Sequence, residues 1–194
     1  MYAKGYKLLF WGMIFLTFNI NLGFINILPD FLGYILIYSG LNILSSQHKL
    51  FIKGKIPALI LILLTIKDVL YDPSSNILAG NNYNTEFIII IIPTIVTIIK
   101  LYLIYILCKG IYDLCKEYGL DELMDRTALS WKIYLIVALI YLAYAPFSIN
   151  LNYKIRTIIL IIIAIIQIIT CINVASLFSR CKVELESEPN ILGI

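Results

Sequence analysis

Lys100 is the residue of this chain whose chemistry most needs an explanation. It lies within residues 87–108, FIIIIIPTIVTIIKLYLIYILC, where it is the only charged side chain. Such a run is long enough to cross a bilayer as one helix. An isolated ammonium at the bilayer centre costs about 2.5–3.5 kcal/mol on insertion scales, so a lysine at that depth is a candidate for function by default. Lys109 follows nine residues later, about 13 Å along a helix, which is farther than the Lys100 side chain reaches.

The Lys100 ammonium therefore needs a polar partner inside a helix bundle or a bound ligand. No apolar segment carries a carboxylate at the same depth. The candidate partners are the Gln167 amide, the Thr170 hydroxyl, the Asn42 amide or a tyrosine hydroxyl. Such groups form polar stripes on three segments: Tyr34, Tyr38, Asn42 and Ser45; Tyr134, Tyr141 and Ser148; Gln167, Thr170 and Asn173. Hydrogen bonding between helices is the ordinary role of these stripes, and a ligand cavity is the alternative.

A second group of charges gathers near one end of the apolar segments. Asp68 and Asp72 are one helical turn apart, Lys67 precedes them, and Asp30 begins another apolar segment. Two carboxylates at this spacing would hold a cation or a cationic ligand. An ordinary hydrated helix end is the other interpretation. The candidate ligand-binding residues are therefore Lys100, Gln167, Asn42, Asp30, Lys67, Asp68 and Asp72.

The sequence contains no recognisable motif for catalysis, a cofactor or a metal. GxSxG, HExxH, Walker and Rossmann patterns are all missing. Cys108, Cys115, Cys171 and Cys181 lie on separate segments and the single histidine is His48, so their spacing predicts free thiols instead of a metal site. We expect no catalytic residue, no metal and no cofactor.

The composition places these residues in a membrane. The chain of 194 residues is 61% hydrophobic and 14% charged, with a net charge of +3, and its mean hydropathy is +0.92. Soluble domains carry about 25% charged residues, because they must cover a surface that faces water. The small net charge does not favour nucleic acid as a partner. We expect an all-α fold, a polytopic transmembrane helix bundle in the cell membrane, with the lipid bilayer as its main partner.

Six apolar segments are long enough to span the bilayer: residues 7–22, 31–46, 56–71, 87–108, 131–148 and 157–178. With six spans, the basic residues of both termini, of the loop around Lys49 and of the loop 109–130 fall on one side. The positive-inside rule then predicts that both termini are cytoplasmic. The first segment has no small-residue cleavage site, so we expect an uncleaved span. The transmembrane domain would cover residues 1–182, and residues 183–194 would form an acidic cytoplasmic tail.

Two connecting stretches have their own signals. If residues 19–44 were one helix, Pro29 and Asp30 would lie at the membrane centre, so we expect a turn at the outer face in which Asp30 caps the next helix. In residues 109–130, the spacing of the apolar side chains predicts an extension of the fourth helix, a break at Gly119 and a short amphipathic helix at the cytoplasmic interface.

The segment INILPDFLGYILIYSGL, with KGIYDLCKEYGLDEL before a span that begins at Trp131, resembles multi-pass membrane proteins of Gram-positive bacteria that share an LPDFxGY-type segment. No activity is attached to that group, so the resemblance implies no functional residue. The number of spans and the chain length also resemble the substrate-binding subunits of vitamin transporters. The first segment, LLFWGMIFLTF, departs from them, because it lacks small residues at four-residue spacing.

Three functions fit these observations. A non-enzymatic accessory or regulatory membrane subunit agrees best with the modest size and the missing motifs. Such a subunit would bind another membrane protein through the Gly33/Gly40 face of the second span or through the 109–130 loop. A small solute transporter or substrate-binding membrane component, built around Lys100, is the alternative. An intramembrane enzyme is the third hypothesis.

Overall fold

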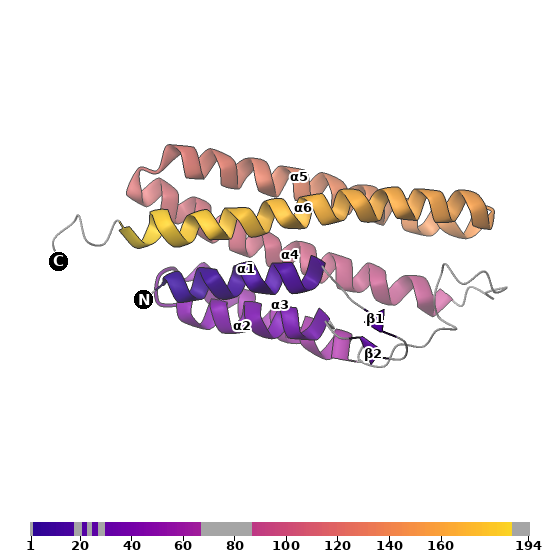
Figure 1. The fold of residues 1–194 in the computed structure, drawn as a ribbon, viewed down its shortest axis with the longest axis horizontal. Helices are drawn as coiled ribbons and strands as arrows, with labels where there is room; N and C mark the ends of the chain where they lie inside the picture. Colours follow the sequence, from indigo (N-terminus) through magenta and orange to yellow (C-terminus); the bar gives the residue numbers. More distant parts are fainter. Residues whose placement is uncertain (1, 18–20, 23–24, 27–29, 67–86, 188–194) are drawn as a thin grey trace.

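The computed structural model describes residues 2–17, 21–22, 25–26, 30–66 and 87–187 (Figure 1). Within these residues the chain forms six α-helices, which are α1 (Ala3–Thr17), α2 (Asp30–Leu44), α3 (Leu50–Thr65), α4 (Phe87–Tyr118), α5 (Asp121–Phe147) and α6 (Tyr153–Ser187). The two-residue strands β1 (Asn21–Leu22) and β2 (Ile25–Asn26) pair antiparallel, and a 3-10 turn, η3 (Ser148–Asn150), joins α5 to α6. The expected all-α fold is confirmed.

The helices form a closed ring. Each helix packs against the one that precedes it in the chain, and α6 packs against α1. Successive helices alternate in direction, and the start of α1 and the end of α6 lie at the same end of the bundle (Figure 1). We call this the terminal end, and the opposite end, which carries β1 and β2, the hairpin end. The ring has an interior toward which side chains of all six helices can point.

The long helices carry the membrane character of the fold. In the described residues, three helices are long and apolar enough to cross a membrane: Ile91–Tyr118, Asp121–Phe147 and Lys154–Leu185. The helices α1, α2 and α3 have 15, 15 and 16 residues. At about 1.5 Å per residue they are shorter than the hydrocarbon core of a typical bilayer, about 30 Å. The expected membrane protein is therefore supported by α4, α5 and α6.

Glycines set the contact between α1 and α2. Gly5 and Gly12 on α1 lie against Gly40 and Gly33 on α2, respectively. A Cβ on Gly12 would lie 2.8 Å from the Gly33 carbonyl oxygen, and a Cβ on Gly40 would lie 2.9 Å from the Gly5 carbonyl oxygen. Both distances are too short for a real Cβ, so only glycine permits this approach. The close crossing predicted at Gly33 and Gly40 is present, but it is made within the chain. The Gly33/Gly40 face is covered by α1, which corrects the expectation that it binds another protein.

Several helix boundaries differ from the sequence expectation. Asn21 and Leu22, expected to end the first span, form β1. The third helix begins at Leu50 instead of residue 56, because Phe51 and Gly54 in its first turns are buried against the bundle. The last helix continues to Ser187, so residues 183–187 are helical and not part of a tail. Leu185 is buried in the core, which explains why this turn is held.

The connection between α4 and α5 is partly as predicted. The fourth helix extends to Tyr118, and Gly119 has a φ of 71°, a left-handed conformation that ends the helix. The prediction of a separate amphipathic helix was wrong, because residues 121–130 form the first turns of the continuous helix α5. Leu123 and Thr127 on its inner face are buried. The apolar face of this segment therefore covers its own bundle.

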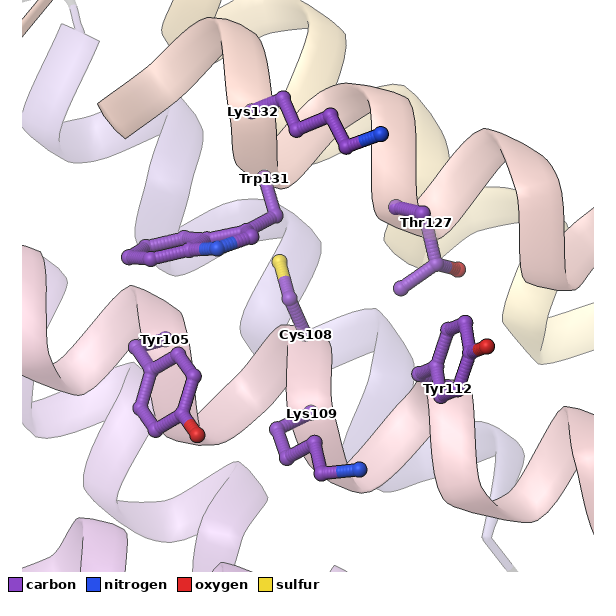
Figure 2. A pocket seen from close by; sticks show the side chains of 8 residues that line it. Tyr105, Cys108, Lys109, Tyr112, Thr127, Trp131 and Lys132 are labelled. Atoms are coloured by element: carbon purple, nitrogen blue, oxygen red, sulfur yellow. The ribbon is translucent and has the colours of Figure 1, made fainter. Parts of the chain in front are cut away.

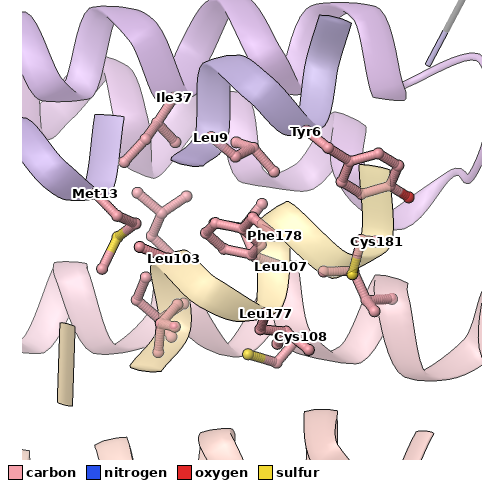
Figure 3. Close-up of a cluster of buried hydrophobic side chains, with 14 of the residues drawn as sticks. Tyr6, Leu9, Met13, Ile37, Leu103, Leu107, Cys108, Leu177, Phe178 and Cys181 are labelled. Carbon is pink, nitrogen blue, oxygen red and sulfur yellow. The ribbon is translucent and has the colours of Figure 1, made fainter. Parts of the chain in front are cut away.

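The best-packed part of the ring lies toward the terminal end. Side chains from α1, α2, α4 and α6 bury one another there (Figure 3), among them Tyr6, Leu9, Met13, Ile37, Leu103, Leu107 and Phe178. Toward the hairpin end the packing loosens, since no residue of 91–99 in α4 or of 155–169 in α6 is buried. Lys100 lies at the transition between the two parts.

We expect the Gly12→Leu variant to unfold at lower temperature, with a loss of about 1–3 kcal/mol, because α1 and α2 must separate to accommodate the side chain. Thermal unfolding of the purified protein in mild detergent measures this. The matched control is Trp11→Leu, at the neighbouring position with 46% of its side chain exposed, which should change stability little. Equal stability of the two variants would contradict the glycine contact.

Candidate functional site

Lys100 faces the interior of the ring, as its depth predicts. The groups that act on its charge are Tyr134 on α5, Cys171 on α6 and Tyr34 on α2, in decreasing order, and then Asp30 at the start of α2. In the ring, α4 neighbours α3 and α5. Tyr134 thus comes from a neighbouring helix, whereas Cys171 and Tyr34 come from helices that do not neighbour α4 in the ring.

Five side chains make up what we call the central polar cluster: Tyr34, Lys100, Tyr134, Gln167 and Cys171. Tyr34, Tyr134 and Cys171 are sealed from the surface, with 1%, 2% and 2% of their area exposed, whereas Lys100 and Gln167 are half-buried. The Gln167 side chain is a hydrogen-bond partner of Tyr134, and its Nε2 donates to Cys171 Sγ over 3.5 Å. The α5–α6 side of the cluster is thus held by its own polar contacts.

The other side of the cluster has unused hydrogen-bonding capacity. Within the described residues, the Lys100 ammonium and the Tyr34 hydroxyl make no hydrogen bond or ion pair. An ammonium only donates hydrogen bonds, and a tyrosine hydroxyl can donate one. In the same part of the chain, Asp30 at the start of α2 is the carboxylate that acts on Lys100. An ammonium and a hydroxyl donor that make no hydrogen bond of their own favour an anion or a carbonyl oxygen over a cation.

The structure separates the other candidate residues from this cluster. Asn42 is exposed, and its Oδ1 accepts a hydrogen bond from Lys55 Nζ at 2.7 Å. It therefore cannot serve as an interior partner of Lys100, and this expectation is corrected. Thr170 is buried, but its hydroxyl donates to the Ile166 carbonyl of its own helix at 2.8 Å. Lys67, Asp68 and Asp72 lie outside the described residues, so the proposed acidic site stays a prediction.

The polar stripes divide between the two roles considered for them. The Ser130 hydroxyl donates to Asn173 Oδ1 at 3.3 Å, which joins α5 to α6 in the ordinary way. On α2, Tyr34 points inward while Tyr38 is exposed, so only the first residue of that stripe reaches the cluster. A stripe of polar residues predicted from helical spacing therefore includes residues that do not face the interior.

Cys171 is the member of the cluster that the sequence did not suggest. The signal for it was its position four residues after Gln167, which places both side chains on one face of α6. All four cysteines are buried free thiols. In the part of the chain that the structure describes, no group of three or more His, Cys, Asp or Glu side chains is placed to hold a metal ion.

Comparison with known proteins adds no family to this description. No protein-family model, curated protein or solved structure matches the chain. The resemblance of residues 25–41 to multi-pass proteins of Gram-positive bacteria stays a prediction.

Replacing Lys100 by methionine should stabilise the protein by about 1–3 kcal/mol, because an ammonium that makes no hydrogen bond or ion pair in the described residues is removed from the interior. Thermal unfolding in mild detergent without added ligand measures the change. Lys116→Met, an exposed substitution on the same helix, controls for the loss of one positive charge and should be neutral. A destabilised Lys100→Met variant would show instead that Lys100 is a structural contact.

Proposed function

We propose that the protein spans the cell membrane six times, with both termini in the cytoplasm. The alternating directions of the helices and the shared position of the two termini support this topology. Most basic residues of the described helices belong to the turns nearest the terminal end: Lys4, Lys7, Lys53, Lys55, Lys109, Lys116, Arg126, Lys132, Arg180 and Lys182. The charged residues in the described part of the hairpin end include Lys154, Arg156 and Asp30. The positive-inside rule then orients the terminal end toward the cytoplasm.

Labelling of single introduced cysteines with a membrane-impermeant maleimide tests the topology. Lys154→Cys, exposed at the start of α6, should react in intact cells. Ser46→Cys, exposed between α2 and α3, should react only after the cells are opened. The natural cysteines are all buried, so the unmodified protein gives the background. The reverse pattern would contradict the orientation, and equal reactivity in intact cells would contradict the six spans.

Within this topology, the protein is a substrate-binding or transporting membrane component for a small anionic solute. The observation that carries this proposal is the Lys100 ammonium, which lies inside the ring among hydroxyl groups and makes no hydrogen bond or ion pair within the described residues. At an effective dielectric constant of about 20, an anion about 4 Å from the ammonium gains about 4 kcal/mol. That gain would offset the desolvation of the Lys100 ammonium.

Each other member of the cluster has a place in such binding. The Tyr34 hydroxyl can donate to a second oxygen of the anion. The Gln167 amide holds Tyr134 and Cys171 in position, so that the opposite wall of the site is preorganised. The favoured ligand is a small carboxylate or another oxyanion. The sequence alone favoured an accessory subunit, and the arrangement around Lys100 now favours its alternative.

A thermal-shift screen of the purified protein against small carboxylates, inorganic phosphate and sulfate tests the binding. A ligand at one hundred times its Kd should stabilise the folded protein by about 2.7 kcal/mol. Lys100→Met should lose this shift, whereas Lys116→Met should keep it. A shift of equal size in Lys100→Met would contradict binding at the cluster, and a panel without any stabilising anion would contradict the proposed ligand class.

An accessory or regulatory subunit is the second candidate. It is favoured by residues 158–166 of α6, which are all apolar and of which none is buried by the chain itself. A pull-down of the tagged protein from its own membrane in mild detergent, followed by mass spectrometry, separates the two candidates. A membrane partner at near-equal amount supports the subunit, and a solitary protein contradicts it. No arrangement of nucleophile, base and oxyanion donors in the described residues supports an enzyme.

A further inference from the structure

A row of exposed side chains on α4 faces away from the ring interior. It takes every third or fourth residue, namely Ile91, Ile95, Ile98, Tyr102, Tyr105 and Lys109. Residues at this spacing lie above one another on one face of a helix. Toward the terminal end, the row changes from aliphatic to phenolic to cationic side chains. A phospholipid presents the same order from its acyl chain through the ester region to its phosphate.

A hollow of about 350 Å³ lies beside the cationic end of this row, between α3 and α4. Its lining includes His48, Lys53, Tyr102, Lys109 and Asp113. Lys53 is exposed, and the Lys109 ammonium pairs with Asp113 at 2.7 Å. The lining of this hollow therefore carries two lysine ammonium groups and one carboxylate, that of Asp113.

A second hollow of about 200 Å³ lies on the other side of the row, between α4 and α5. Figure 2 shows its lining, to which Tyr105, Tyr112 and Trp131 contribute aromatic rings and Lys132 a further ammonium. The rings of Tyr105 and Trp131 are 5.2 Å apart. Tyr105 and Lys109 line both hollows, so the two form one continuous face.

The two hollows together hold three lysines and one carboxylate, which makes this face complementary to an anion. The aromatic rings and the aliphatic end of the row make it complementary to a hydrocarbon chain as well. Tyrosine and tryptophan are enriched at the level of lipid headgroups, and basic pockets between helices there bind anionic headgroups. A soluble anion would use only the first of these features.

We propose that this face binds one anionic phospholipid, with its phosphate between Lys53 and Lys109 and one acyl chain along the exposed row of α4. Tyr105 and Trp131 border the ester region and keep the chain beside α4. The assignment to the cytoplasmic leaflet depends on the proposed topology. The anionic headgroup does not, and the site is separate from Lys100, so either proposal can fail without the other.

Quenching of Trp131 fluorescence by brominated lipids tests the proposal in the full-length protein. The chain has two tryptophans, so Trp11→Phe leaves Trp131 as the single reporter. The protein in mild detergent is titrated with phosphatidylglycerol or phosphatidylcholine, each brominated on its acyl chains. Phosphatidylglycerol should quench at lower concentration, with about a five-fold difference in affinity for each lysine engaged. Equal quenching by the two lipids would overturn the proposal.

Matched variants locate the effect. Lys53→Gln with Lys109→Gln should abolish the preference for phosphatidylglycerol, whereas Lys49→Gln with Lys116→Gln, which removes two exposed lysines outside the lining, should retain it. A preference that survives the first pair overturns the site. If that pair does not fold, Lys53→Gln alone should lower the preference and Lys109→Arg should keep it. Glycerol phosphate and inorganic phosphate should not displace the brominated lipid, and displacement by either would show that a soluble phosphate is the ligand.

Discussion

The close approach of α1 and α2 is the contact on which the closed ring depends. The helix α1 packs against both α2 and α6, and it is the element that joins the first helix pair to the last. Carbonyl oxygens of Gly5 and Gly33 lie where Cβ atoms of the opposing helix would otherwise be. In lipid, adding apolar contacts gives little advantage, so close backbone packing is the main source of specificity between helices. The glycines therefore decide the order of the helices, and through it the residues that meet in the interior.

The position of Tyr34 follows from this contact. It is next to Gly33, so the residue that packs on α1 also sets the direction in which Tyr34 enters the interior. There it meets Lys100, which comes from a helix on the other side of the ring. The packed core lies on the terminal-end side of Lys100, and no residue of 91–99 in α4 is buried on the other side. A charge held at the end of a well-packed core, with donors around it, is the arrangement on which the proposed anion binding rests.

Two regions of different character thus share α4. Its inner side carries Lys100 into the interior, and its outer side carries the row that ends at Lys109. The same helix contacts α3 and α5, which supply the walls of both outer hollows. A lipid seated on the outer side would hold α3, α4 and α5 together near the interface, and would add to the contact between Gly110 on α4 and the Phe51 ring on α3.

The sequence by itself determined the membrane character, the helical class, the break at Gly119 and the inward direction of Lys100, because each follows from local composition, from one glycine or from the depth of one charge. Helix limits were less well predicted: Lys53 and Lys55 were taken for a loop and belong to α3, since a helix start has a weak signal when no capping residue precedes it. Only the tertiary structure decided which polar residues meet. Asn42 and Tyr34 lie on one helix, yet Asn42 faces outward to Lys55 and Tyr34 faces Lys100. Helical periodicity defines a face, whereas the neighbouring helices decide what that face meets.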